Sequence, residues 1–152
     1  SKEKRETMFL VKEVNLNEII DIRHKILRPN QTRDECFYET DKSEEVFHLG
    51  AFANEKLVSI ASFHRENNKD LGFENQFRLR GMATLENYRK QGAGRELIEY
   101  AIKQLKTKGI ECLWCNGRTS VIDYYEKLGF EIFGEEFDYP PIGMHIVLYR
   151  KI

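Results

Sequence analysis

The sequence has few cysteines, few prolines and no excess of charge of either sign. Its 24 Lys and Arg residues are balanced by 25 Asp and Glu residues, which gives a net charge of −1. Nucleic-acid-binding proteins usually carry a strong basic excess or a basic stripe, so this balance argues against a nucleic-acid partner. The three cysteines, Cys36, Cys112 and Cys115, are an odd number, which favours a reducing, cytoplasmic environment.

Long apolar runs are also missing. No stretch approaches the roughly 18 apolar residues that a membrane-spanning helix needs. Residues 1–6 are polar and lack the apolar segment of a secretory signal, so we expect no export signal and no membrane partner. A chain of about 150 residues buries about 68–70% of its unfolded surface, so a single domain over residues 1–152 needs no disulfide or metal to be stable.

Apolar periodicity predicts alternating strands and helices. We expect strands over residues 9–14, 46–53, 56–63, 77–83, 110–115, 130–134 and 144–149. Helices are expected after Asn17 as N-cap, along the apolar face of residues 97–105 with Gly109 as its end, and over residues 120–128 before Gly129. Antiparallel strands followed by strand–helix–strand crossovers predict an α/β (α+β) fold with a mixed, mostly antiparallel sheet.

Two glycines stand directly before the longest predicted helix. Gly92 and Gly94 let a ligand approach the backbone, and the unpaired N–H groups of a helix's first turn attract anions. Arg89, Lys90 and Arg95 add positive charge to this segment of an otherwise neutral chain. The spacing is neither that of a Walker loop nor that of a dinucleotide fingerprint. A tight turn with a solvated basic flank is the alternative.

Two segments resemble one protein family. Arg89-x-x-Gly92-x-Gly94 resembles the Arg/Gln-x-x-Gly-x-Gly/Ala motif of the GNAT family, the Gcn5-related N-acetyltransferases. Residues 124–130, Tyr-Tyr-Glu-Lys-Leu-Gly-Phe, resemble that family's second hallmark, in the right order and at about the right distance. The resemblance implies a GNAT fold: six to seven strands that splay between strands 4 and 5, about four flanking helices, and acetyl-CoA bound in the splay.

The resemblance also implies which residues contact the coenzyme. The pyrophosphate would lie on the amides of the loop, the pantetheine arm would pair with the fourth strand, and Arg89, Lys90 or Arg95 would reach the adenosine phosphates. The family often has an asparagine seven residues before its conserved tyrosine. In this chain that position is Arg118, and the nearest asparagine, Asn116, lies nine residues before Tyr125. Either Asn116 or Arg118 can contact the coenzyme. The implied set is Met82, Ala83, Thr84, Arg89, Lys90, Gln91, Gly92, Ala93, Gly94, Arg95, Asn116, Arg118 and Tyr125.

Tyr125 occupies the position of the family's usual general acid, which hydrogen-bonds the coenzyme sulfur as the thiol leaves. A reference tyrosine has a pKa of about 10 and a thiol one of about 8.5, so complete proton transfer to the thiolate is uphill by about 2 kcal/mol. Tyr125 is therefore expected to act mainly by stabilising the developing negative charge. The alternative, stronger for Tyr124, is a tyrosine that only packs its helix onto the sheet.

The acceptor side is less defined. Deprotonating a primary amine at pH 7 costs about 4–5 kcal/mol, so a base is expected. The candidates are Glu35, Glu39, Asp41, His48, His64 and His145. Residues 36–48 and 142–145 resemble the ElaA-like subgroup of the family, which implies that Asp41, His48 and His145 gather near the acceptor. If the carboxylates of residues 35–45 border the cleft, a cationic acceptor such as a polyamine would suit them; a solvated acidic face is the alternative.

Cys112 and Cys115 fall on one strand and point to opposite faces, so they are expected neither to bind a metal nor to form a disulfide. Direct attack is therefore favoured over a route through cysteine. We expect an acetyl-CoA-dependent N-acetyltransferase that acts on a small molecule or an exposed residue. A non-catalytic acyl-CoA sensor and an acyltransferase with a longer acyl group remain alternatives. The oligomeric state is left open, with a homodimer as one option because many proteins of this fold form dimers.

Overall fold

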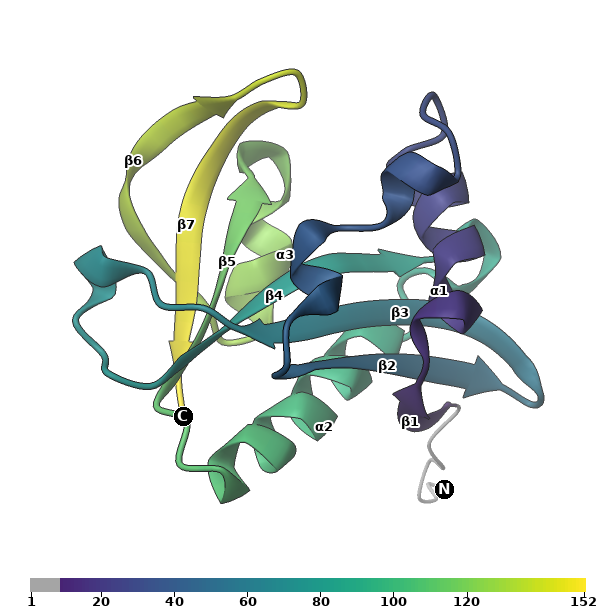
Figure 1. The fold of residues 1–152 in the computed structure, drawn as a ribbon, viewed down its shortest axis with the longest axis horizontal. Helices are drawn as coiled ribbons and strands as arrows, with labels where there is room; N and C mark the ends of the chain where they lie inside the picture. The colour runs from purple at the N-terminus through teal and green to yellow at the C-terminus, as the bar shows by residue number, and fades with distance from the viewer. Residues whose placement is uncertain (1–8) are drawn as a thin grey trace.

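The computed structural model describes residues 9–152, so the polar start on which the export prediction rests lies outside the described residues. It contains one seven-stranded sheet with the order β1-β2-β3-β4-β5-β7-β6 (Figure 1). The strands are β1 (Leu10–Val14), β2 (Val46–Ala53), β3 (Lys56–Arg65), β4 (Gln76–Thr84), β5 (Cys112–Arg118), β6 (Glu131–Tyr139) and β7 (Gly143–Lys151). The predicted mixed, mostly antiparallel sheet is confirmed, and β4–β5 is its parallel pair.

The sheet opens between β4 and β5, as expected. The two strands pair only over Gln76–Arg78 and Cys112–Trp114 and then diverge, which Figure 1 shows as β5 turning away from β4. β5 stays paired with β7 as far as Arg118. β4 instead contains a bulge, because Gly81 and Met82 lie opposite the single residue Ala61 of β3. Gly81 has a φ of +65°, a conformation that glycine adopts without strain, so it allows the bend that opens the sheet.

Three α-helices flank the sheet in the described part of the chain, where about four were expected: α1 (Leu16–Ile22), α2 (Ala93–Thr107) and α3 (Ile122–Lys127). The other helical pieces are a π-helical turn at Arg23–Leu27 and 3₁₀ turns at Asp34–Cys36, Glu39–Lys42, Lys69–Leu71, Glu86–Tyr88 and Thr119–Val121. Within residues 9–152, no helix has both the length and the apolarity needed to cross a membrane.

The helices α1 and α2 cover opposite faces of the sheet. Ile60 of β3 belongs to the buried cluster that contains Ile19 and Ile22 of α1. The next residue, Ala61, belongs to the larger cluster that contains Leu97 and Ile98 of α2. Successive strand residues face opposite sides of a sheet, so each helix has its own apolar surface to bury.

Three helix ends illustrate how local sequence sets the boundaries. Gly109 (φ +76°) and Gly129 (φ +91°) follow α2 and α3 in the left-handed conformation, as predicted. The N-cap of α1 is Asn15, so the prediction of Asn17 was wrong. The Asn15 side chain accepts from the Glu18 amide, and the Glu18 carboxylate accepts from the Asn15 amide, which forms a capping box two residues earlier.

Candidate active site

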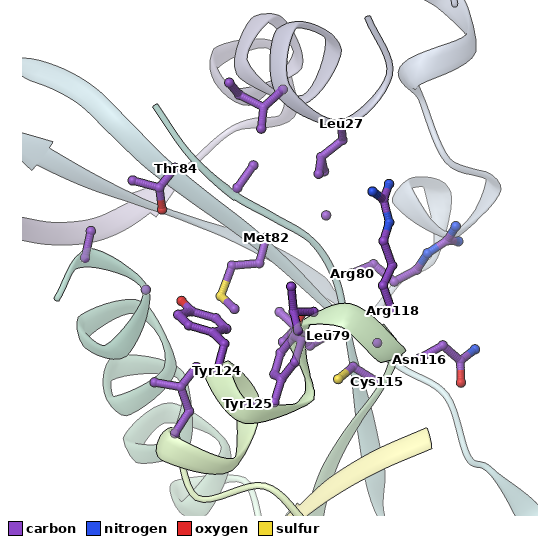
Figure 2. Close-up of a pocket in the computed structure, with 18 of the residues that line it drawn as sticks. Leu27, Leu79, Arg80, Met82, Thr84, Cys115, Asn116, Arg118, Tyr124 and Tyr125 are labelled. Carbon is purple, nitrogen blue, oxygen red and sulfur yellow. The ribbon is translucent and has the colours of Figure 1, made fainter. Parts of the chain in front are cut away.

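A cavity of about 910 Å³ occupies the opening between β4 and β5. Its walls are the second half of β4, the end of β5, the first turn of α2, the helix α3 and the segment Ile26–Arg28 (Figure 2). This volume lies near the upper end of the range for small-molecule sites. Of the residues predicted to contact the coenzyme, all except Gln91 line the cavity.

The glycine-containing loop is built as a helix N-terminus. Gly92 is the N-cap of α2 with a φ of +93°, and Lys90 just before it has a φ of +63°. Side chains hold the loop in place: Arg89 Nε donates to the Thr84 carbonyl at 3.1 Å, and Arg95 Nη2 donates to the Lys127 carbonyl of α3 at 2.7 Å. The free amides of the first turn of α2 therefore face the cavity between basic side chains, which suits a bound phosphate.

Tyr125 lies on α3 with its ring against β5. A Cβ on Gly117 would lie 2.7 Å from Leu148 Cδ1 and 3.2 Å from the Tyr125 ring, so glycine at this position leaves room for both side chains. Tyr125 and Cys115 line the same part of the cavity wall (Figure 2). Burial, followed by the neighbouring Cys115, raises the pKa of Tyr125 well above its usual value, and burial raises the pKa of Cys115 to about 12. Both groups keep their protons at neutral pH, so Cys115 is unsuited to act as a nucleophile.

Tyr124 has a different environment from Tyr125. Its side chain is 43% exposed, and its hydroxyl touches the first turn of α2 at the place where a Cβ on Gly94 would project. The absence of a side chain on Gly94 thus leaves the space that the Tyr124 hydroxyl occupies. Tyr124 stacks edge-on against Tyr125, with ring centroids 5.5 Å apart.

His145 of β7 lines the cavity and is 5% exposed. Its Nδ1 lies 2.8 Å from the Gly143 carbonyl, which can only accept, so Nδ1 carries the proton. In the neutral ring Nε2 then has a free lone pair. His145 is the strand partner of Arg118 at the end of β5, and its ring packs on Tyr139 at 4.9 Å.

The structure brings Asp41 and His48 together, 4.0 Å apart, but neither lines the cavity. Asp41 pairs with the fully buried Arg23 at 2.8 Å and accepts from the Tyr38 amide at 2.7 Å. His48 Nδ1 lies 2.7 Å from the Ser62 hydroxyl, and burial lowers the pKa of His48 although Asp41 partly raises it. These two residues support the wall of the cavity from behind.

The other candidate bases also lie outside the cavity. His64 pairs with Glu66 at 2.8 Å, and Glu35 and Glu39 are exposed. Among residues 9–152, no Asp or Glu side chain lines the cavity. The carboxylates of residues 35–45 therefore do not line the cavity, and the condition for a polyamine-like acceptor is not met.

The sequence-based prediction missed Tyr38, Arg28 and Arg80, which line the cavity. One signal was available: Arg78 and Arg80 alternate with the apolar Phe77 and Leu79, which places both arginines on one face of β4.

A sheet that splays beside a helix N-terminus, with a cavity in the opening, is the arrangement of coenzyme-A-dependent acyltransferases. The acetyltransferase (GNAT) family model matches residues 16–130, and the chain belongs to this family, whose members use acetyl-CoA. It is 46% identical over 145 residues to the uncharacterized N-acetyltransferase YitI of Bacillus subtilis, covering 95% of this chain and 97% of YitI.

Solved structures share the fold. Escherichia coli ElaA matches with a TM-score of 0.74 at 14% identity, over 94% of this chain and 99% of ElaA. An aminoglycoside 6'-N-acetyltransferase complexed with coenzyme A matches with a TM-score of 0.69 at 15% identity, over 93% and 96% of the two chains.

Proposed function

We propose that the chain transfers the acetyl group of acetyl-CoA to a primary amine by direct attack, with Tyr125 as the acid and His145 as the base. The observation that carries this proposal is that the Tyr125 side chain and a histidine with a free Nε2 line one cavity. The first turn of α2 lines the same cavity and suits the coenzyme's pyrophosphate.

In the proposed reaction, the amine nitrogen attacks the thioester carbonyl as its proton passes to His145 Nε2. The new C–N bond forms, the C–S bond breaks, and the electron pair of that bond leaves with the coenzyme sulfur. The Tyr125 hydroxyl points to the coenzyme sulfur as the thiol leaves. Since its pKa is raised, Tyr125 stabilises the thiolate mainly by donating a hydrogen bond.

The coenzyme's place can be tested with a pair of glycine variants. Gly92→Ala and Gly72→Ala both add a methyl group in open space at a positive φ, so each should be strained by about 1–2 kcal/mol. Gly92 belongs to the α2 N-terminus, whereas Gly72 ends a remote 3₁₀ turn. In calorimetric titrations, Gly92→Ala should weaken acetyl-CoA binding about tenfold, which corresponds to about 1.4 kcal/mol. Gly72→Ala should leave the affinity unchanged.

The titration also separates the alternatives. 3′-Dephospho-CoA should bind more weakly than CoA if the basic loop holds the adenosine phosphates. Equal weakening by both glycine variants would place the coenzyme elsewhere. Tight binding without turnover of any amine would favour a sensor.

His145→Gln should lower kcat/KM about 100-fold at pH 7, because the amine then has no base to accept its proton. The deficit should shrink as the pH rises toward the amine's own pKa, because more of the acceptor is then already neutral. The matched control is His64→Gln, a buried histidine outside the cavity, whose turnover should stay within about threefold of the parent. A pH-independent loss, or no loss, would remove His145 as the base.

A further inference from the structure

The charged side chains that line the cavity are all of one sign. Basic side chains line both ends of the cavity, while no acidic side chain of residues 9–152 does so. One group surrounds the α2 N-terminus and the end of α3, where the coenzyme phosphates are proposed to lie: Arg89, Lys90, Arg95 and Lys127. The coenzyme would neutralise this group, but a second basic group remains.

The second group lies at the opposite end of the cavity. Figure 2 shows Arg80 and Arg118 on one side of Met82, with Thr84 and Tyr124 on the other. Arg28, which follows Leu27 in the chain, also lines the cavity and completes this group. Arg118 is the strand partner of His145, so this end of the cavity adjoins the proposed base.

The buried Tyr38 ring organises these arginines. Three guanidinium groups contact it: Arg23 at 3.8 Å, Arg80 at 4.1 Å and Arg28 at 5.0 Å from the ring centroid. Asp41 neutralises only Arg23. Within residues 9–152, neither Arg28 nor Arg80 forms a salt bridge, so two positive charges around one ring lack a counter-charge.

The Arg80 guanidinium is positioned by the Tyr38 ring but makes few hydrogen bonds. It is half-buried, and its one hydrogen bond in the described chain is a long one, 3.5 Å from Nη1 to the Thr40 hydroxyl. Burial and then the neighbouring Arg78 lower the pKa of Arg80, because both disfavour its positive charge. An anion would remove this penalty, since a planar guanidinium can bind a carboxylate or phosphate with two hydrogen bonds.

We propose that the acceptor is an amine that also carries an oxyanion, either a carboxylate or a phosphate, which Arg80 and Arg118 bind while the amine faces His145. This inference rests on the proposed acetyl transfer and names its substrate class. Arg28, which also lines the cavity, adds attraction for the anion. The neutral chain thus concentrates positive charge at both ends of one cavity, for the coenzyme and for the acceptor.

The test measures thiol release from acetyl-CoA with matched amines. The pairs are amino acids of graded chain length against their carboxamides, and O-phosphoethanolamine against ethanolamine; spermidine represents polycations. We expect the anionic member of at least one pair to have a kcat/KM at least tenfold above its neutral partner. The two series distinguish carboxylate from phosphate. Preferred turnover of neutral amines or spermidine would overturn this inference alone, whereas no thiol release with any amine would overturn the proposed function as well.

Variants then locate the anion. Arg80→Met should lower kcat/KM for the anionic acceptor about 10- to 100-fold, mainly through KM, as expected for a lost charge-assisted hydrogen bond. The neutral partner should be affected less than threefold, and acetyl-CoA affinity should not change. Arg80→Lys keeps the charge but loses the planar guanidinium group. Its kcat/KM for the anionic acceptor should lie between those of the parent and of Arg80→Met. Arg33→Met, at an exposed arginine paired with Asp21, is the control. An equal loss for the anionic and neutral acceptors would overturn the assignment.

Discussion

Asp41→Ala is expected to lower the free energy of unfolding by about 3–5 kcal/mol, the usual cost of leaving a buried charge without its partner. Arg23 is completely buried, and Asp41 is 3% exposed. Without Asp41, the Arg23 guanidinium keeps only the Cys36 carbonyl at 2.7 Å and the Ser62 hydroxyl at 2.9 Å as hydrogen-bond partners. Its Nε already has none among the described residues.

Urea denaturation followed by circular dichroism would measure this loss, with Asp21→Ala as the control. Asp21 forms an ion pair with Arg33 at 3.1 Å, but both side chains are exposed, so its removal should cost less than about 1 kcal/mol. Similar values for the two variants would contradict the view that the Arg23–Asp41 pair supports the cavity wall. Since Asp41 does not line the cavity, the folded fraction of the variant should still bind acetyl-CoA.

Tyr125→Phe is expected to lower kcat about 100-fold while the affinity for acetyl-CoA stays within about twofold. Removing one preorganised donor to a developing anion typically costs 10²–10³ in kcat. The ring is retained, so its edge-on packing against Phe130 at 5.5 Å and its contact with Gly117 survive. Steady-state kinetics would measure the loss of kcat, and calorimetric titration with acetyl-CoA would measure any loss of binding.

Tyr124→Phe is the matched control, because it removes a hydroxyl from the adjacent residue of the same helix. The Tyr124 hydroxyl lies against Gly94 of α2 rather than against Cys115, so kcat should change less than threefold. If Tyr124→Phe lost turnover and Tyr125→Phe kept it, the two roles would be reversed. If both retained full turnover, neither tyrosine would be the acid.

Much of the fold could be predicted because its signals are local. The strand over residues 46–53 coincides with β2, and Gly109 and Gly129 end their helices as expected. Boundaries set by side chains were missed: Asn15 and Asn17 are both good N-caps, and only the return contact from Glu18 selects Asn15. The strand predicted over residues 130–134 extends to Tyr139, because pairing with β7 resumes beyond an irregularity between Phe133 and Phe137.

The candidate site divides in the same way. The loop around Gly92 and the position of Tyr125 could be read from short motifs, because a helix N-terminus and its preceding glycine are built from neighbouring residues. The acceptor end could not, because it joins Tyr38, Arg80 and His145 from three distant segments. Short-range patterns could suggest that Asp41 is polar and near a cleft, but not that Arg23 already neutralises it.

The sequence by itself determined the class of fold, the glycine-containing start of α2 and the position of Tyr125 on α3, since periodicity and motif spacing depend on neighbouring residues. Only the tertiary structure decided which charges remain free. Ion pairing between residues 18 positions apart buried Asp41 with Arg23, while the bulge at Gly81 and the splay of β4 from β5 left Arg80 facing the cavity. Charge neutralisation depends on distance in space, and that distance exists only once the chain has folded.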